Sequence, residues 1–180
     1  RLTRPAPRPD PDLFPSRLSV TEIETLVRDP YSIFARHILG LEALEPMAVV
    51  PGAAERGSLI HKILGDFSQA HPGPLPADAE TLLYALALDA FGPLQDQYPE
   101  LYAEWFPRYE RMAVAFLEWE ASQRQGLRAI HAERSGKLTI PLGEKTFTLS
   151  ARADRIEARA DGGYCIVDFK TGTPPSNCTV

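Results

Sequence analysis

The sequence lacks the features that mark several classes of protein. It has no apolar run near the roughly 18 residues that a membrane-spanning helix needs, so we expect no membrane partner. It has two cysteines, Cys165 and Cys178, which are too few for a disulfide framework or a four-thiolate metal site. Such scarcity of cysteine favours a reducing, cytoplasmic setting.

An excess of basic residues is also missing. The formal net charge is −5 at pH 7, whereas the usual footprint of a nucleic-acid binder is basic. A metal site concentrates carboxylates, however, and other domains can complete a binding groove, so the charge does not exclude DNA. The chain has neither an initial methionine nor a charged-then-apolar leader, and we expect it to be part of a longer protein.

What is present is ordinary for one globular domain. The chain has 180 residues, of which 44% are apolar and 24% charged, enough for a substantial hydrophobic core. Proline recurs through residues 1–16, and this composition predicts an extended linker from a preceding domain. The domain itself is expected over residues 17–180.

The first part of this domain has helical patterns. Ser19 and Glu22 have the spacing of a capping box, so a helix should begin there. Asp29-Pro30 predicts the start of a second helix, which Gly40 should end. Apolar residues at helical spacing predict three further helices, over about residues 55–70, 79–91 and 107–125.

The period then changes to the alternation of strands. Residues 128–140 and 145–158 read as extended segments, and the apolar run Tyr164-Cys165-Ile166-Val167 is typical of a buried strand. Cys165 is then a small core residue, not a ligand. Helices followed by a strand meander predict an α+β domain.

A charged pair follows the last predicted strand. Because side chains alternate along a strand, Asp168 and Lys170 should share one face, and Phe169 should point into the opposite layer. A hairpin that pairs Ile156 with Cys165 or Ile166 would bring Asp154 beside Asp168.

Two neighbouring aspartates repel each other unless a cation lies between them. Hard divalent cations such as Mg²⁺ or Mn²⁺ take oxygen ligands of this kind, so the pair predicts a metal site. The alternative is that Asp154 pairs with Arg152 or Arg155 on a solvated face.

These residues carry a resemblance to a known family. The run Val167-Asp168-Phe169-Lys170-Thr171-Gly172 resembles the D-x-K-T-G element of the PD-(D/E)XK nuclease superfamily, in its RecB-like branch. That branch combines G-x-x-x-H, G-x-x-D, D-x-K and Q-x-x-x-Y signatures. Gly57-Ser58-Leu59-Ile60-His61 matches the first, and Ala151-Arg152-Ala153-Asp154 matches the second with alanine in place of glycine. The fourth has no match, and we expect it beyond Val180, so that the domain is truncated before its C-terminal helix.

The start of the domain is similar to that of AddB proteins, subunits of the bacterial helicase–nuclease AddAB. The similar segments are Leu18-Ser19-Val20-Thr21-Glu22-Ile23 and Asp29-Pro30-Tyr31-Ser32-Ile33-Phe34. Many AddB domains have Cys-Pro-Tyr where this chain has Asp29-Pro30-Tyr31, and that cysteine helps to bind an iron–sulfur cluster. Because this first ligand is absent and Cys165 and Cys178 do not make up a set, we expect no cluster.

The resemblance implies a fold and a chemistry. The fold is a restriction-endonuclease-like core, with a central mixed sheet flanked by helices, after an N-terminal helical region. His61, Asp154, Asp168 and the carbonyl of Phe169 would bind Mg²⁺ or Mn²⁺, which polarises the scissile phosphate and activates a water. Lys170 would orient or activate that water and offset charge building on phosphorus.

The implied function is a metal-dependent DNA exonuclease. It would hydrolyse phosphodiester bonds in single-stranded DNA during double-strand break repair and recombination, beside an AddA-like helicase subunit in an AddAB/RecBCD-like enzyme. The alternative is a catalytically silent module that guides DNA or binds partner proteins.

Several residues have two readings from the sequence alone. His61 is either a ligand or a histidine satisfied in a helix packed on the core. Glu133 is either a further acidic site residue or the partner of Arg134 or Lys137 at the surface. A group of aromatic residues either stacks on bases or packs in the core: Tyr98, Tyr102, Trp105, Phe106 and Tyr109. A group of arginines either tracks a phosphate backbone or forms a solvated face: Arg108, Arg111, Arg124, Arg128 and Arg134.

Overall fold

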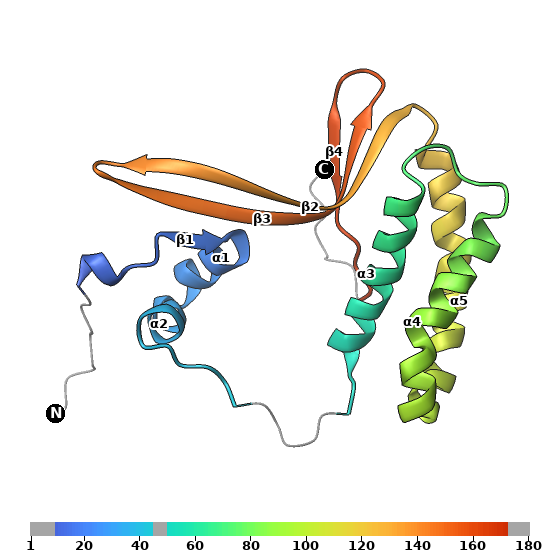
Figure 1. The fold of residues 1–180 in the computed structure, drawn as a ribbon, viewed down its shortest axis with the longest axis horizontal. Helices are drawn as coiled ribbons and strands as arrows, with labels where there is room; N and C mark the ends of the chain where they lie inside the picture. The colour runs from blue at the N-terminus through green and yellow to red at the C-terminus, as the bar shows by residue number, and fades with distance from the viewer. Residues whose placement is uncertain (1–9, 45–49, 173–180) are drawn as a thin grey trace. The chain divides into compact units, whose positions relative to one another are not determined.

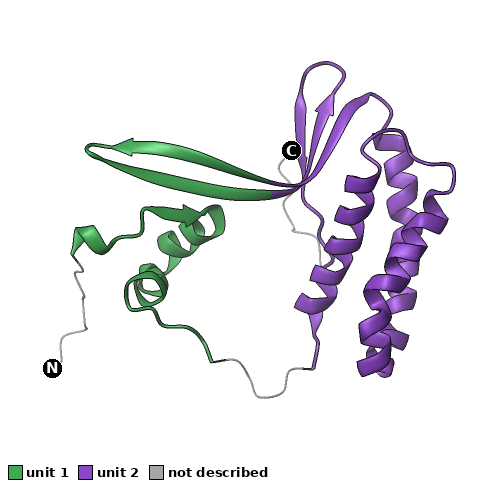
Figure 2. Cartoon of the chain, in the orientation of Figure 1, with its two compact units in different colours: residues 1–48, 135–152 green, residues 49–134, 153–180 purple. Residues whose placement is uncertain are grey.

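The computed structural model describes residues 10–44 and 50–172, which form two compact units (Figures 1 and 2). Unit 1 takes its residues from 1–48 and 135–152, and unit 2 takes its residues from 49–134 and 153–180. Within the described residues, no helix combines the length and the apolar character that crossing a membrane requires.

Unit 1 begins with short elements. They are the 3-10 helix η1 (Pro11–Leu13), strand β1 (Arg17–Ser19), helices α1 (Val20–Arg28) and α2 (Pro30–Ile33), and the π-helix η2 (Phe34–Ile38). The predicted capping box is confirmed, because the Ser19 backbone N–H donates to Glu22 Oε2 over 2.8 Å and the Glu22 N–H donates to Ser19 Oγ. Of the predicted linker, residues 1–9 lie outside the described part, and the rest is not simply extended, since η1 lies within it.

Unit 2 contains three long helices, α3 (Ala53–Ala70), α4 (Ala79–Gln97) and α5 (Pro99–Gln123). Two of their predicted bounds are wrong. Helix α4 continues through Pro93, and α5 begins at Pro99 and passes through Pro107. A proline inside a helix removes one backbone hydrogen bond, and here the apolar packing on either side outweighs that loss.

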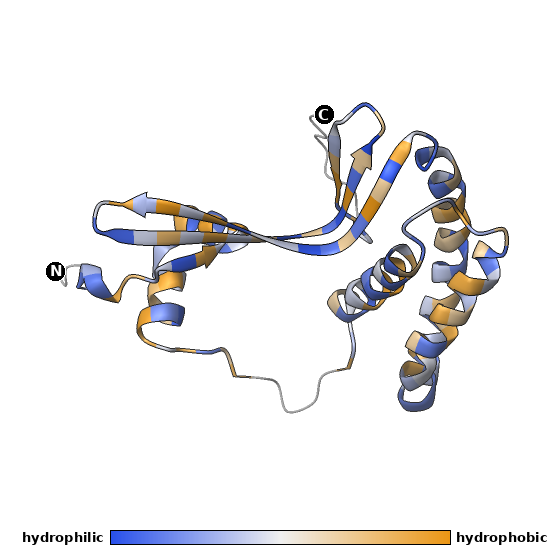
Figure 3. Cartoon of the chain, turned by 45° about the horizontal axis from the view of Figure 1, so that its top comes forward, coloured by the Kyte–Doolittle hydropathy of each residue, from blue (hydrophilic) through white to orange (hydrophobic). Residues whose placement is uncertain are grey.

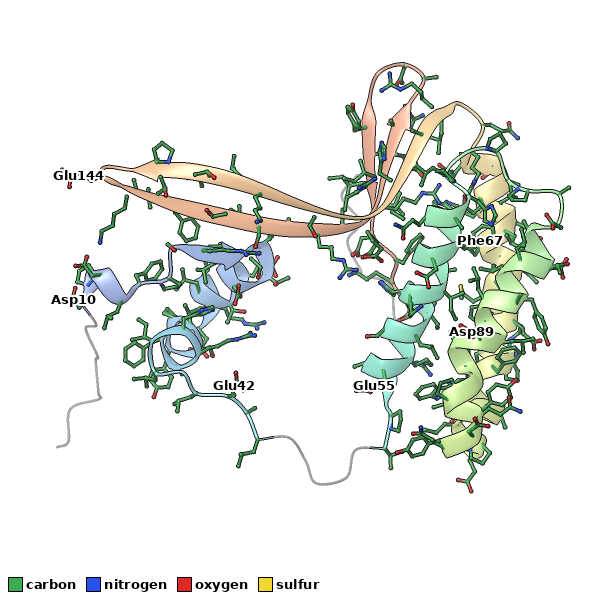
Figure 4. The ribbon with its side chains drawn as sticks, in the orientation of Figure 1. Asp10, Glu42, Glu55, Phe67, Asp89 and Glu144 are labelled. Carbon is green, nitrogen blue, oxygen red and sulfur yellow. The ribbon has the colours of Figure 1, made fainter. Side chains whose placement is uncertain are left out.

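The core of unit 2 lies among these helices. Figure 3 shows hydrophobic residues recurring along α3, α4 and α5, and Figure 4 labels Phe67 on α3, a fully buried member of the core. Trp105, Phe106 and Tyr109 are also buried in it, with ring centroids of Phe91 and Phe106 only 5.3 Å apart. Core packing is therefore confirmed for these three aromatic residues of α5.

The remaining strands are β2 (Leu127–Leu142), β3 (Lys145–Arg159) and β4 (Tyr164–Val167). The sheet has the order β1-β3-β2, with β4 also paired to β3. Strand β1 runs parallel to β3 and β4 runs antiparallel to it, so the sheet is mixed. A four-stranded mixed sheet flanked by helices is the architecture expected of a restriction-endonuclease-like core.

The prediction that β4 is a buried strand is wrong. Tyr164 and Ile166 are 69% and 71% exposed, and Cys165 is only half-buried, so it is not a core residue. Among the described residues β4 pairs with β3 alone. Burial of an apolar strand also requires other residues to pack over its faces, and the composition of the strand does not provide them. Cys178 lies outside the described residues.

Candidate active site

The β3–β4 hairpin brings Asp154 to the segment that carries Asp168 and Lys170. Its register pairs Ile156 with Ile166 and Arg155 with Val167, which confirms the predicted pairing. Beyond the last pair, the backbone N–H of Phe169 donates to Asp154 Oδ2 over 2.9 Å. Asp154 is thus fixed against the start of the segment that carries Asp168 and Lys170.

His61 reaches this hairpin from α3. Its Nδ1 lies 3.4 Å from Asp154 Oδ2, with side chains 29% and 19% exposed. The imidazole also meets the ring of Phe169 edge-on, at 6.2 Å between centroids. His61 is therefore half-buried against a carboxylate, and core packing alone does not describe it.

One face of α3 carries the contacts to β2, to β3 and to the segment after β4. Gly57, His61 and Gly65 recur at intervals of four residues, and such residues lie one above another on a helix. A Cβ on Gly57 would lie 3.1 Å from Thr171 Oγ1. A Cβ on Gly65 would lie 3.0 Å from Glu133 Oε1, so the two glycines give room to the side chains that flank the His61–Asp154 contact. Gly65 repeats the interval from Gly57 to His61, so the four-residue spacing in the sequence already marks this face of α3.

Glu133 lies on β2 in an uncommon backbone conformation. Its φ is 54°, in the left-handed region that residues other than glycine rarely adopt. The residue is half-buried, and its carboxylate lies against Gly65 of α3. Strained backbone of this kind concentrates at functional sites, and it aims an acidic side chain at the face of α3 that carries His61.

Asp168 and Lys170 lie just after β4. Lys170 Nζ is 2.6 Å from Asp168 Oδ2, which agrees with the prediction that both side chains share a face. The hydrogen bond that the Lys170 ammonium donates to Asp168, together with the negative charge of Asp168, raises the pKa of Lys170. The two side chains are 56% and 63% exposed, and exposed ion pairs contribute little, so Asp168 can exchange this partner at small cost.

Phe169 points away from this pair, as predicted. It packs against the helical core, with its ring 5.9 Å from Phe116 and 6.3 Å from Trp119 between centroids. This packing anchors the backbone whose N–H reaches Asp154, so the core of unit 2 positions the site.

The opposite face of β3 is tied to α5 by buried charges. Arg155 is fully buried and pairs with Glu120 and Glu157, with its guanidinium 5.0 Å from the Trp119 ring centroid. The alternative that Asp154 pairs with Arg155 at the surface is therefore wrong. Arg124 is also buried, and it donates to Glu120 and to the backbone carbonyl of His71, so it does not track a phosphate backbone.

The donor chemistry fits a hard divalent cation in part. An imidazole nitrogen and a carboxylate oxygen face each other, and both are ordinary ligands of Mn²⁺. In the part of the chain that the structure describes, however, no group of three His, Cys, Asp or Glu side chains is arranged to hold a metal ion. The structure brings His61 and Asp154 together, while Asp168 contacts Lys170 instead.

Comparison with known proteins supports the reading of these motifs. The family model of the PD-(D/E)XK nuclease superfamily matches residues 17–178, which is nearly the whole chain. The matched range includes His61, Asp154, Asp168 and Lys170.

Proteins of several Rickettsia species contain a segment similar to this chain. The chain is 30% identical to an uncharacterized protein of Rickettsia felis and 29% identical to one of Rickettsia bellii, with 91% of the chain covered in each case. A Rickettsia conorii protein is 30% identical over the same share. The chain spans about a fifth of the length of these relatives, since the match covers 19% or 20% of each.

Proposed function

Because this chain belongs to the PD-(D/E)XK nuclease superfamily, we propose that it is a metal-dependent deoxyribonuclease, acting as an exonuclease on single-stranded DNA. The observation that carries this proposal is the meeting of three separate motifs. His61 of G-x-x-x-H contacts Asp154, and Asp154 accepts a hydrogen bond from the backbone of the Asp168-Phe169-Lys170 segment. An accidental motif match would leave these residues scattered.

Each residue has a proposed role. His61, Asp154, Asp168 and the carbonyl oxygen of Phe169 would hold Mg²⁺ or Mn²⁺. The bound ion would supply Lewis-acid stabilisation of the phosphate and a lower pKa for a coordinated water. Lys170 presents a positive charge, because a lysine ammonium is protonated at neutral pH. That charge would offset the negative charge that builds on the phosphoryl oxygens during attack.

The wider setting is part of the proposal. The segments Leu18–Ile23 and Asp29–Phe34 are similar to the start of AddB nuclease domains, which supports a helicase–nuclease of the AddAB or RecBCD kind with an AddA-like helicase subunit. Such an enzyme would resect DNA during double-strand break repair in the cytoplasm. The chain spans about a fifth of its Rickettsia relatives, which leaves room for further domains in the whole protein.

A second candidate is a nuclease-like module that has lost catalysis and guides DNA or binds a partner. One observation favours it: within the described residues, Asp168 pairs with Lys170 and does not complete a three-ligand group. The first candidate is preferred because His61, both aspartates and Lys170 are all retained, and a site without catalysis has no need of that combination.

Cleavage of labelled single-stranded DNA by the whole protein tests the proposal. Degradation should require Mg²⁺ or Mn²⁺, and Asp168→Ala and Lys170→Ala should each reduce its rate by about 100-fold or more. Mn²⁺ titration by calorimetry should show binding that Asp154→Ala weakens. A strand labelled at either end distinguishes exonucleolytic from internal cleavage.

The chain supplies a matched control in the ion pair Lys62–Asp66. This pair lies on the outside of α3, with side chains 65% and 44% exposed, similar to Lys170–Asp168. Lys62→Ala and Asp66→Ala should leave cleavage unchanged. Cleavage that survives Asp168→Ala and Lys170→Ala would refute the mechanism. Metal-independent DNA binding without any cleavage would favour the silent module.

A further inference from the structure

A cavity opens beside the proposed catalytic pair, within unit 2. It has a volume of about 720 Å³ and lies between α3, α5 and residues 167–171. Its walls are strongly aromatic, with contributions from Trp105, Phe116, Trp119 and Phe169. Cavities of this size and lining are typical of sites for small organic groups.

The rim of the cavity carries positive charge. Arg56 lies 5.8 Å above the ring centroid of Trp105 and has no carboxylate partner among the described residues. Arg108 lines the cavity from α5, half-exposed beside Glu104, and Lys170 lines it from the segment after β4. Aromatic walls with cations at the rim match a nucleotide, which has a flat apolar base and an anionic phosphate.

The cavity is continuous with the proposed site, because Asp168 and Lys170 belong to both. We propose that the cavity binds one unpaired base of single-stranded DNA, which belongs to the nucleotide next to the bond that is cut. This inference rests on the proposed function. Arg56 then faces the phosphate of that nucleotide. A base in a duplex is paired and stacked, and must be extracted before it can enter a pocket. The cavity therefore selects single strands for the site.

An apolar protein segment is the competing occupant. It would use the aromatic walls, but it has no need of Arg56 and Lys170 at the rim. A base and a peptide are distinguished by removing the base while the phosphates remain. A thymidine dodecamer and a dodecamer of abasic sites have the same charge and differ in that respect alone.

The chain offers a matched pair of substitutions on α5. Ala115 is exposed and lines the cavity, whereas Ala103 is exposed and does not. Ala115→Trp fills the cavity without removing any group, and Ala103→Trp adds the same side chain elsewhere on the helix. Binding is measured by fluorescence anisotropy in the whole protein, with a chelator present to prevent cleavage.

The thymidine strand should bind about tenfold more weakly to Ala115→Trp than to Ala103→Trp, since stacking of one base is worth about a factor of ten or more. The abasic strand should bind the two variants alike. Equal binding of the thymidine strand by both variants would overturn the inference, as would an equal loss for both strands. Metal-dependent cleavage by wild-type protein, measured separately, shows whether the proposed function stands when the base pocket fails.

A second measurement needs no substitution. A strand with 5-iodouracil at each position in turn is irradiated with the wild-type protein, and the cross-linked residues are identified by mass spectrometry. Cross-links to Trp105, Trp119 or Phe169 are expected. Cross-links confined to residues outside the cavity would overturn the inference even if Ala115→Trp failed to fold.

Discussion

Arg155 offers the sharpest test of how unit 2 is held together. The Arg155 side chain is 0% exposed. It pairs with Glu120 and Glu157, whose side chains are 0% and 3% exposed. The buried group also includes Arg124, so two positive and two negative charges balance. The perturbation is Arg155→Met, which keeps the volume of the side chain but removes its charge.

The expected loss follows from the charges that remain. After Arg155→Met, Glu120 keeps Arg124 as a partner, but Glu157 is left buried without one. Removing one partner of a buried pair typically costs about 3–5 kcal/mol. The original pair is itself imperfect, because Arg155 Nη2 and Glu157 Oε1 lie 2.7 Å apart without the alignment of a hydrogen bond. We therefore expect about 3 kcal/mol, the lower end of that range.

Urea denaturation followed by circular dichroism measures this loss. For a chain of this length, about 3 kcal/mol corresponds to a fall in Tm of roughly 10 °C. The control is the double variant Arg155→Met with Glu157→Gln, in which no carboxylate remains unpaired, and it should recover most of the stability. A single variant within about 1 kcal/mol of wild type, or a double variant less stable than the single, would refute the reasoning.

The remaining predictions concern the face of α3, the metal and the N-terminal cap. Gly57→Ala should slow DNA cleavage, because the added Cβ meets the Thr171 hydroxyl. It should not lower Tm, because alanine favours a helix over glycine by about 1 kcal/mol. Unchanged cleavage kinetics would contradict this prediction. His61→Ala should weaken Mn²⁺ binding in calorimetry, and equal affinity would exclude His61 as a ligand. Hydrogen bonds from the Ser19 backbone N–H and from His37 lower the pKa of Glu22 from 4.5 to about 2. The ionised Glu22 therefore contributes stability that is fully present above pH 4.5 and is lost as the pH falls through about 2. Glu22→Gln should therefore destabilise by about 1 kcal/mol at pH 7 and by almost nothing at pH 2, as measured by urea denaturation at both values.

The hairpin of the site was predictable because it depends on local rules. Gly162 adopts a φ of 91° in the turn between β3 and β4, and the alternation of side chains then determines which residues oppose each other. This is why the sequence predicts the pairing of Ile156 with Ile166 and the nearness of Asp154 to the last motif. The capping box at Ser19 is local in the same way.

The errors concern interactions between residues far apart in the sequence. From the sequence, Arg155 looks like a surface residue beside Asp154. In the structure it is buried and pairs with Glu120, which lies 35 residues earlier on α5. The apolar run of β4 predicts burial, yet burial requires a second layer, and a strand's own composition does not reveal whether one is present. Helix α4 passes through Pro93 because packing of the surrounding residues outweighs the lost hydrogen bond.

The face of α3 explains how such distant parts meet at one site. Gly57 and Gly65 lie eight residues apart, about 12 Å along the helix, with His61 midway between them. At each glycine a side chain from another segment comes within 3.1 Å of the position that a Cβ would occupy. The close approach at both ends holds the helix near β2 and the segment after β4, and so His61 Nδ1 reaches Asp154. The glycine of the G-x-x-x-H motif therefore gives the close approach that lets the histidine of the same motif reach Asp154.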